Sequence, residues 1–157
     1  VKLTDAGVIQ LATSDGTRSG TTDGISMLGI FAGVQYSDST GRPSLSPFWP
    51  ASTAGTDIIA WVYDDPETIF DVQYDNPAAG TTVQTAVGEQ CDWVPTAPGG
   101  STAVGLSATK LTAIQATQAQ FQITGIAGGV DNALTDAFVT VTVRMNEAQY
   151  KAPVASV

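Results

Sequence analysis

The segment FVTVTVRM at residues 138–145 alternates apolar and polar side chains without interruption. Its apolar positions are Val139, Val141, Val143 and Met145, and its polar positions between them are Thr140, Thr142 and Arg144. Successive side chains of a β-strand point to opposite faces, so this period of two predicts a strand with one buried face. Its Val and Thr residues add strand propensity.

Residues 119–124, AQFQIT, repeat this alternation on a shorter scale. Phe121 and Ile123 are expected to point inward, and the polar residues that flank them, Gln120 included, are expected to point outward. The stretch that follows, GIAGGVDNALTD, is rich in glycine and contains Asn132, which indicates turns. It is longer than a tight hairpin turn.

The apolar run ISMLGIFAGVQY at 25–36 is interrupted by Gly29 and Gly33. A buried helix is conceivable there, but glycines among Ile, Phe and Val favour a strand with a bulge or bend. The opening segment VKLTDAGVIQLAT is expected to form short strands and turns.

Further strands are expected around Val83 and over 91–94, and a short helix is expected near 111–118. The eight prolines and sixteen glycines are spread along the chain, so no domain boundary is indicated. The whole 157-residue chain is therefore predicted to be one all-β domain with few or no helices. Its architecture is expected to be an antiparallel β-sandwich or barrel with extended loops at 37–57 and 95–118.

The charge balance restricts the partners of this chain. Six Lys and Arg stand against fifteen Asp and Glu, which gives a net charge of -9. Nucleic-acid affinity depends on cationic side chains that displace condensed counterions, and anionic lipid surfaces also attract cations. We therefore expect neither nucleic acid nor a membrane as partner. No apolar run approaches the ~20 residues that cross a bilayer.

The chain has no histidine and a single cysteine, Cys91. The absence of histidine excludes Ser-His-Asp and Cys-His nucleophile pairs, and it removes His-ligated metals. One cysteine forms neither an intrachain disulfide nor a cysteine zinc site. We therefore expect a protein without enzymatic activity or cofactor, in which Cys91 is a small apolar residue.

Carboxylates are concentrated in WVYDDPETIFDVQYD at 61–75, and they are Asp64, Asp65, Glu67, Asp71 and Asp75. A hard-cation site is one interpretation, because Ca²⁺ takes several carboxylate oxygens. A catalytic acid pair is another. The favoured interpretation is two strands that meet at a turn, with Pro66 at its first corner and the Asp65 side chain folded onto a nearby backbone amide. Whether Asp64, Asp65 or Glu67 binds a cation stays open at this point.

The segment GRPSLSPFWPAST at 41–53 combines three prolines with Phe48 and Trp49. It predicts an extended loop whose aromatic side chains either pack on the sheet or contact a partner. Arg42 is a candidate anchor, because Arg and aromatic residues are enriched at interface cores. Trp61, in contrast, is expected to belong to the core.

The segment SPFWPASTAGTDIIAWVYDDPETIFDVQYD at 46–75 resembles a segment of small virion proteins of tailed bacteriophages. The shared features are a proline and aromatic loop, Ala-Ser-Thr, a hydrophobic strand, Asp-Asp-Pro, and a strand with Phe, Val and Gln. The preceding GIFAGVQYSDSTGRP is similar to the part of those proteins where a strand ends in Gly-Val and an aromatic residue. The likeness covers about half of the chain and is specific only over 47–75.

The phage proteins in question resemble capsid decoration or cement proteins, which bind outside an assembled head and hold neighbouring coat subunits together. The resemblance implies a β-rich, often jelly-roll or barrel-like fold, a homodimer or homotrimer, and the major capsid protein as partner on the outer surface of the virion. It implies no catalytic residues.

Residues expected to contact the capsid or another copy are Arg42, Phe48, Trp49, Lys151 and Pro153, which lie in the 41–53 loop and the C-terminal KAPVASV. The alternative is a carbohydrate- or receptor-binding β-sandwich module of a phage particle. In that case Trp49 or Trp93 would stack on a sugar ring.

Overall fold

The computed structural model describes residues 1–4, 6–11, 27–50, 53–75, 83–94, 101, 103, 107–114 and 119–149. Its elements in chain order are β1 (Lys2–Leu3), β2 (Ile9–Gln10), β3 (Ile30–Ser37), β4 (Pro43–Ser46), β5 (Thr56–Tyr63), β6 (Ile69–Asp75), the 3₁₀ turn η1 (Val83–Ala86), β7 (Gln90–Val94), β8 (Lys110–Ile114), β9 (Phe121–Ile126) and β10 (Phe138–Met145). The prediction of an all-β chain is confirmed. No helix in these ranges is long and apolar enough to cross a bilayer.

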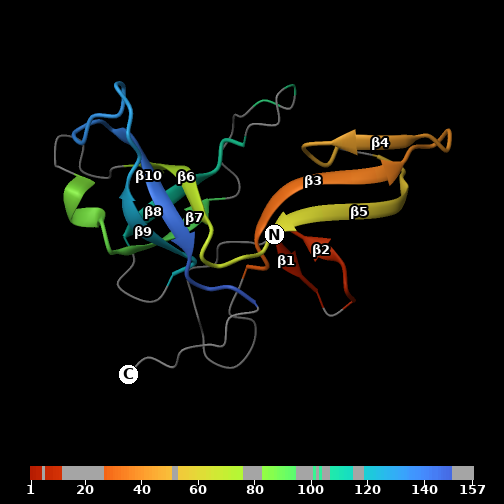
Figure 1. Ribbon diagram of the computed structural model, residues 1–157, viewed down its shortest axis with the longest axis horizontal. Coiled ribbons are helices and arrows are strands. Elements are labelled where there is room, and N and C mark those ends of the chain that lie inside the picture. The colour runs from red at the N-terminus through yellow and green to blue at the C-terminus, as the bar shows by residue number, and fades with distance from the viewer. Residues whose placement is uncertain are drawn as a thin grey trace.

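Five strands close into a barrel in the order β10-β6-β8-β7-β9 (Figure 1). Four of the five strand pairs in the barrel are antiparallel, and the β6–β8 pair is parallel. The sequence interpretation allowed a barrel but expected antiparallel pairing throughout. The parallel pair arises because η1 and β7 lie between β6 and β8 along the chain, so that β8 enters the barrel in the same direction as β6.

The barrel core contains the apolar face of β10. Val139, Val141, Val143 and Met145 are fully buried, as their spacing predicts. The same buried core cluster also includes Phe121, Ile123, Leu111, Tyr74 and Cys91. Burial of each Val, Leu, Ile, Phe or Met side chain of this cluster contributes about 1.5–3 kcal/mol. The barrel is therefore the main source of stability in the described part of the chain.

Gln120 departs from its predicted outward position and is only 3% exposed. It precedes β9, and its hydrogen bonds explain why its burial is tolerated. Its backbone N–H donates to Asp92 Oδ1 at 3.1 Å, and its carbonyl oxygen accepts from the Asn146 N–H at 2.8 Å. Its side-chain oxygen accepts a hydrogen bond from the backbone N–H of Trp93 at 3.4 Å. Buried polar groups are stable when they are paired in this way.

A second sheet has the order β4-β3-β5 and extends beside the barrel, with the β3–β4 turn at its far end (Figure 1). The pairing of β3 with β5 shifts register between Phe31 and Gly33, which confirms the bulge predicted from the glycines. Gly29 lies just before β3, where a Cβ atom would come within 2.1 Å of the Tyr63 carbonyl oxygen. Only glycine lets the two backbones approach so closely.

Four expectations about local structure are wrong. The predicted loop at 37–57 contains β4, which begins with Pro43 at a sheet edge where proline is tolerated. The predicted loop at 95–118 contains β8. The helix predicted near 111–118 is likewise strand β8 as far as residue 114, because burial of Leu111 in the barrel outweighs local propensity. Val83 lies in η1, whose buried residues Val83 and Ala86 are one 3₁₀ turn apart.

Backbone and side-chain contacts join the two ends of the described chain to the barrel. Met27 is a member of the barrel core and forms an isolated parallel bridge with Ala148. Gln149 donates its backbone N–H to the Met27 carbonyl oxygen at 2.8 Å. The Gln149 side chain accepts from the Leu3 N–H at 2.7 Å and donates to the Leu3 carbonyl oxygen at 2.9 Å. The β1–β2 hairpin is thereby tied to the end of β10.

Candidate partner-binding surface

The acidic segment forms the connection from β5 to β6. Asp65 Oδ1 accepts a hydrogen bond from the Glu67 N–H at 2.9 Å, and the Asp65 carbonyl oxygen accepts from the Thr68 N–H at 3.1 Å. Pro66 therefore occupies the first corner of the turn, and Asp65 folds onto a backbone amide as predicted. The two strands do not pair with each other, because β5 belongs to the three-stranded sheet and β6 to the barrel.

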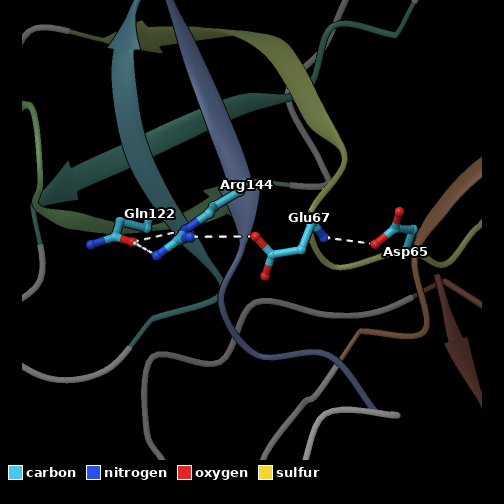
Figure 2. A network of polar contacts seen from close by, with 4 residues as sticks. All are labelled: Asp65, Glu67, Gln122 and Arg144. Atoms are coloured by element: carbon cyan, nitrogen blue, oxygen red, sulfur yellow. Dashed lines mark hydrogen bonds and ion pairs between the residues drawn. The ribbon is translucent and has the colours of Figure 1, made fainter.

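Glu67 connects this turn to the outside of the barrel (Figure 2). Glu67 Oε2 lies 3.6 Å from Arg144 Nη1. The Nε and Nη2 atoms of Arg144 donate to Gln122 Oε1 at 3.0 and 2.8 Å. Residues from the crossover, β9 and β10 thus form one polar network, which positions the crossover against the barrel.

The other acids of the segment are dispersed. Asp75 forms an ion pair with Lys110 on β8, while Asp64 and Asp71 are exposed. Within the described ranges, no group of three or more His, Cys, Asp or Glu is arranged to hold a metal ion. The carboxylates of this region therefore serve a turn, an ion pair and the solvated surface.

Cys91 is fully buried in the barrel. Burial raises the pKa of its thiol to about 12, and the nearby carboxylates of Asp92 and Glu89 act in the same direction. The thiolate is the nucleophilic form of cysteine, so this side chain is chemically inert at neutral pH.

One face of the three-stranded sheet carries four exposed large apolar side chains. Gln35 of β3 lies opposite Leu45 on one side and Ile59 on the other, so these residues share a face. Trp61 and Tyr63 follow Ile59 at the spacing of two that keeps side chains on one face of a strand. We call Leu45, Ile59, Trp61 and Tyr63 the apolar stripe, and their exposed fractions are 74, 53, 45 and 57%.

The glycine in β3 helps to define this surface. Gly33 lies opposite Trp61 and has φ 153°, and its missing Cβ would lie 4.0 Å from Trp61 Cε3. The indole therefore rests beside the glycine and remains accessible to solvent. Tyr63 contacts Phe70 edge to face, with ring centroids 6.5 Å apart. Phe70 packs on the barrel core, so the apolar stripe begins at the barrel and continues along the sheet.

The opposite face of the sheet is partly covered by the loop that follows β4. Trp49 contacts Tyr36 edge to face, with ring centroids 5.5 Å apart, and it is 44% exposed. A Cβ atom at Gly55 would lie 3.0 Å from the Tyr36 ring. Phe48 is half-buried beside Trp49. Trp49 therefore packs on the sheet and keeps part of its surface accessible.

Arg42 lies at the far end of the sheet, in the turn between β3 and β4, and it is exposed. The turn is organised by Asp38, whose Oδ1 accepts from the Thr40 hydroxyl at 2.6 Å, the Thr40 N–H at 2.8 Å and the Arg42 N–H at 3.1 Å. These hydrogen bonds, the Thr40 hydroxyl first, lower the pKa of Asp38. Gly41 supplies the left-handed conformation, with φ 78°.

The predicted contact residues do not form one cluster. Arg42 lies in the far turn, and Phe48 and Trp49 lie in the loop over the face opposite to the apolar stripe. Lys151 and Pro153 lie outside the described residues. Trp61 was expected in the core, and its 45% exposure contradicts that interpretation.

The sequence interpretation missed Leu45, Ile59 and Tyr63 as surface residues. For Ile59 and Tyr63 the run DIIAWVY contained a signal, because apolar residues occupy both sets of its alternating positions and so place some of them on an exposed face. Trp93, the other candidate sugar platform, is half-buried, and its Nε1 atom is buried without an acceptor among the described residues.

Comparison of the chain with protein-family models gave no match. Comparisons with curated proteins and with solved structures also gave none.

Proposed function

We propose that this protein is a structural component of a phage virion that decorates the outside of the head and clamps neighbouring major capsid protein subunits, acting as a homodimer or homotrimer. The observation that carries the proposal is the apolar stripe. Exposed large apolar side chains that gather on one face of a sheet mark interaction sites, because their burial against a partner releases free energy. Ile59, Trp61 and Tyr63 follow one another on β5, and Leu45 lies across Gln35 from Ile59.

The resemblance to phage virion proteins also supports this sheet as the interaction site. It is specific only over 47–75, which comprises the loop containing Trp49, strand β5, the acidic crossover and β6. These elements build the two faces of the sheet and connect it to the barrel. The barrel then serves as the stable body, and the sheet as the part that contacts the shell.

To clamp the shell, the protein needs only to bind the assembled shell more tightly than the separated coat subunits. A protein that binds the assembled shell and not its separated subunits stabilises the shell by RT ln(1 + [L]/Kd), about 2.7 kcal/mol per site when its concentration is 100 times Kd. Because the shell is symmetric, the same contact is repeated at many sites, and the stabilising free energies of these sites add up. The net charge of -9 suits the outside of the shell better than a lining that faces DNA.

The test is co-sedimentation of the purified protein with emptied capsids of the phage that encodes it, together with the melting temperature of those capsids. We expect saturable binding at a fixed ratio to coat subunits and a higher melting temperature. Ile59→Ser should weaken binding at least about fivefold, because burial of one Ile side chain is worth about 1.5–3 kcal/mol. Ile69→Ser is the matched control, since Ile69 lies on the barrel and is similarly exposed, 62% against 53% for Ile59.

Absence of binding to these capsids would reject the decoration role. The carbohydrate- or receptor-binding alternative would then lead, because the indoles of Trp49 and Trp61 are both partly exposed. A glycan array with wild-type protein and the Trp49→Ala and Trp61→Ala variants tests it. Loss of one glycan signal in a single variant would identify the stacking residue.

A further inference from the structure

Strand β5 is an eight-residue edge strand. Among the described residues it pairs only with β3, on one side. Alternate residues of a strand direct their backbone N–H and C=O groups to opposite sides, so the outer side of β5 presents a row of donors and acceptors. Such a row is a template for another strand.

The two edges of this sheet differ in their protection. The β4 edge is four residues long and begins with Pro43, which lacks an N–H donor. Short length and proline are devices that prevent pairing with other chains, and edge lysines serve the same purpose. The β5 edge has neither proline nor lysine over TDIIAWVY, and Asp57 is its only charged residue. Its bulge, where the register with β3 shifts and Asp57 has φ 50°, lies at the start of the strand and leaves residues 58–63 beyond it. The accessible edge is therefore on the β5 side.

Carboxylates flank the apolar part of this edge. Asp57 lies near the start of β5 and Asp64 directly after its end, and both are exposed. The six residues between them, IIAWVY, are uncharged. Asp57 and Asp64 are therefore seven residue steps apart, about 23 Å at about 3.3 Å per residue. Charge complementarity thus specifies a partner with cationic side chains about 23 Å apart and apolar ones between them.

We propose that the free edge of β5 accepts an added strand from the partner, namely an extended apolar segment with Lys or Arg at each end. The proposal rests on the proposed function, because it places this segment in the coat subunit. Backbone hydrogen bonds provide the affinity, and alternate side chains of the added strand pack beside Ile59, Trp61 and Tyr63 on the stripe face.

A second copy of β5 is a poorer occupant. Antiparallel pairing about Ala60 places Asp57 of one copy opposite Tyr63 of the other, next to Asp64 in the chain. Asp57 of one copy and Asp64 of the other would then be offset by one residue, and like charges this close repel each other. The flanking carboxylates therefore favour a basic segment over self-association of this edge.

Hydrogen exchange of the protein bound to emptied capsids tests the added strand. We expect backbone amides in 56–63 to exchange about tenfold more slowly on the capsid than in solution, because new hydrogen bonds must open before exchange. Amides of β4, at 43–46, should change less than twofold. Binding to capsids with unchanged exchange over 56–63 would overturn the added strand and leave the decoration role standing.

A peptide experiment gives an independent result if the capsids do not bind. The probe is a blocked peptide, Lys-Thr-Val-Thr-Val-Thr-Val-Lys, titrated into isotope-labelled protein, with a Glu-flanked version as control. We expect amide shifts confined to β5 and its partner β3, and at least about fivefold weaker binding of the Glu-flanked peptide. Absence of shifts, or equal binding of the two peptides, would overturn the inference whatever the capsids do.

Edge variants complete the test. Ile58→Lys adds a cation to the β5 edge and should reduce binding of the Lys-flanked peptide at least about fivefold. Val130→Lys is the matched control, because Val130 is fully exposed in the loop between β9 and β10 and takes the same change in charge. Equal effects of the two variants would attribute binding to overall charge and contradict the edge assignment.

Discussion

Arg144 on β10 and Glu67 in the crossover from β5 to β6 form an ion pair between the barrel and the crossover, with Nη1 and Oε2 3.6 Å apart (Figure 2). Their side chains are 40 and 66% exposed, so solvent screens the pair. A double-mutant cycle with Arg144→Met and Glu67→Gln should give a coupling of about 0.5 kcal/mol in urea unfolding, and less in 1 M salt. A coupling energy above about 2 kcal/mol would contradict the conclusion that solvent screens this ion pair.

Replacement of Gly29 by Ala should destabilise the protein strongly. The added Cβ would lie 2.1 Å from the Tyr63 carbonyl oxygen and 2.7 Å from Val62 Cγ1, so the backbones of β3 and β5 must separate. We expect a loss of about 3 kcal/mol in the free energy of unfolding, measured by denaturant titration. Gly128→Ala is the control, because nothing lies within 4 Å of its Cβ position. Equal stability of the two variants would refute the close approach.

Cys91 should be unreactive toward thiol reagents in the native state. Its pKa of about 12 keeps the thiolate fraction very small below pH 9, and its side chain has no exposed surface. Ellman's reagent at pH 8 should therefore detect no thiol until guanidinium unfolds the barrel, and one thiol per chain afterwards. Rapid reaction without denaturant would show that the barrel opens readily around β7.

Asp38 should make the β3–β4 turn sensitive to acid. Its folded pKa is lowered, so its contribution to stability is complete above the ordinary value of 3.8 and is lost as pH falls through the folded pKa. Asp38→Asn retains a side-chain oxygen acceptor without a titrating group. The change in melting temperature between pH 6 and pH 2.5 should therefore be smaller in this variant. A carboxyl pKa of Asp38 at or above 3.8 by NMR titration would contradict the hydrogen-bond geometry.

Surface and core substitutions should separate binding from folding. Ile59→Ser should change the free energy of unfolding by less than about 1 kcal/mol, because Ile59 is 53% exposed. Val141→Ala removes two methyl groups from the fully buried barrel core and should cost about 2 kcal/mol. Circular dichroism during thermal and urea unfolding measures both. A destabilisation by Ile59→Ser as large as that by Val141→Ala would mean that Ile59 supports the fold and is not free to bind.

Local patterns predicted several elements well. The inward faces of β9 and β10 follow from the alternation around Phe121 and Val141, because only one face of each strand is apolar. The bulge at Gly33 and the turn at Pro66 were also predicted, since each depends on the conformational limits of one residue. The prediction for Trp61 was wrong, because residues on both sides of β5 are apolar and the pattern does not say which face is covered.

The sequence by itself determined that this chain is all-β, where most of its strands lie, and which residues of β10 enter the core. Its shortage of cationic residues and lack of histidine also limited the chemistry available. Only the tertiary structure decided that β5 and β6, adjacent in the chain, belong to different sheets, and that β6 pairs in parallel with β8. The period of a strand specifies the orientation of its side chains, whereas its neighbours are chosen by contacts between residues far apart in the chain. For the same reason the exposed face of Trp61 and the open edge of β5 became visible only in the folded molecule.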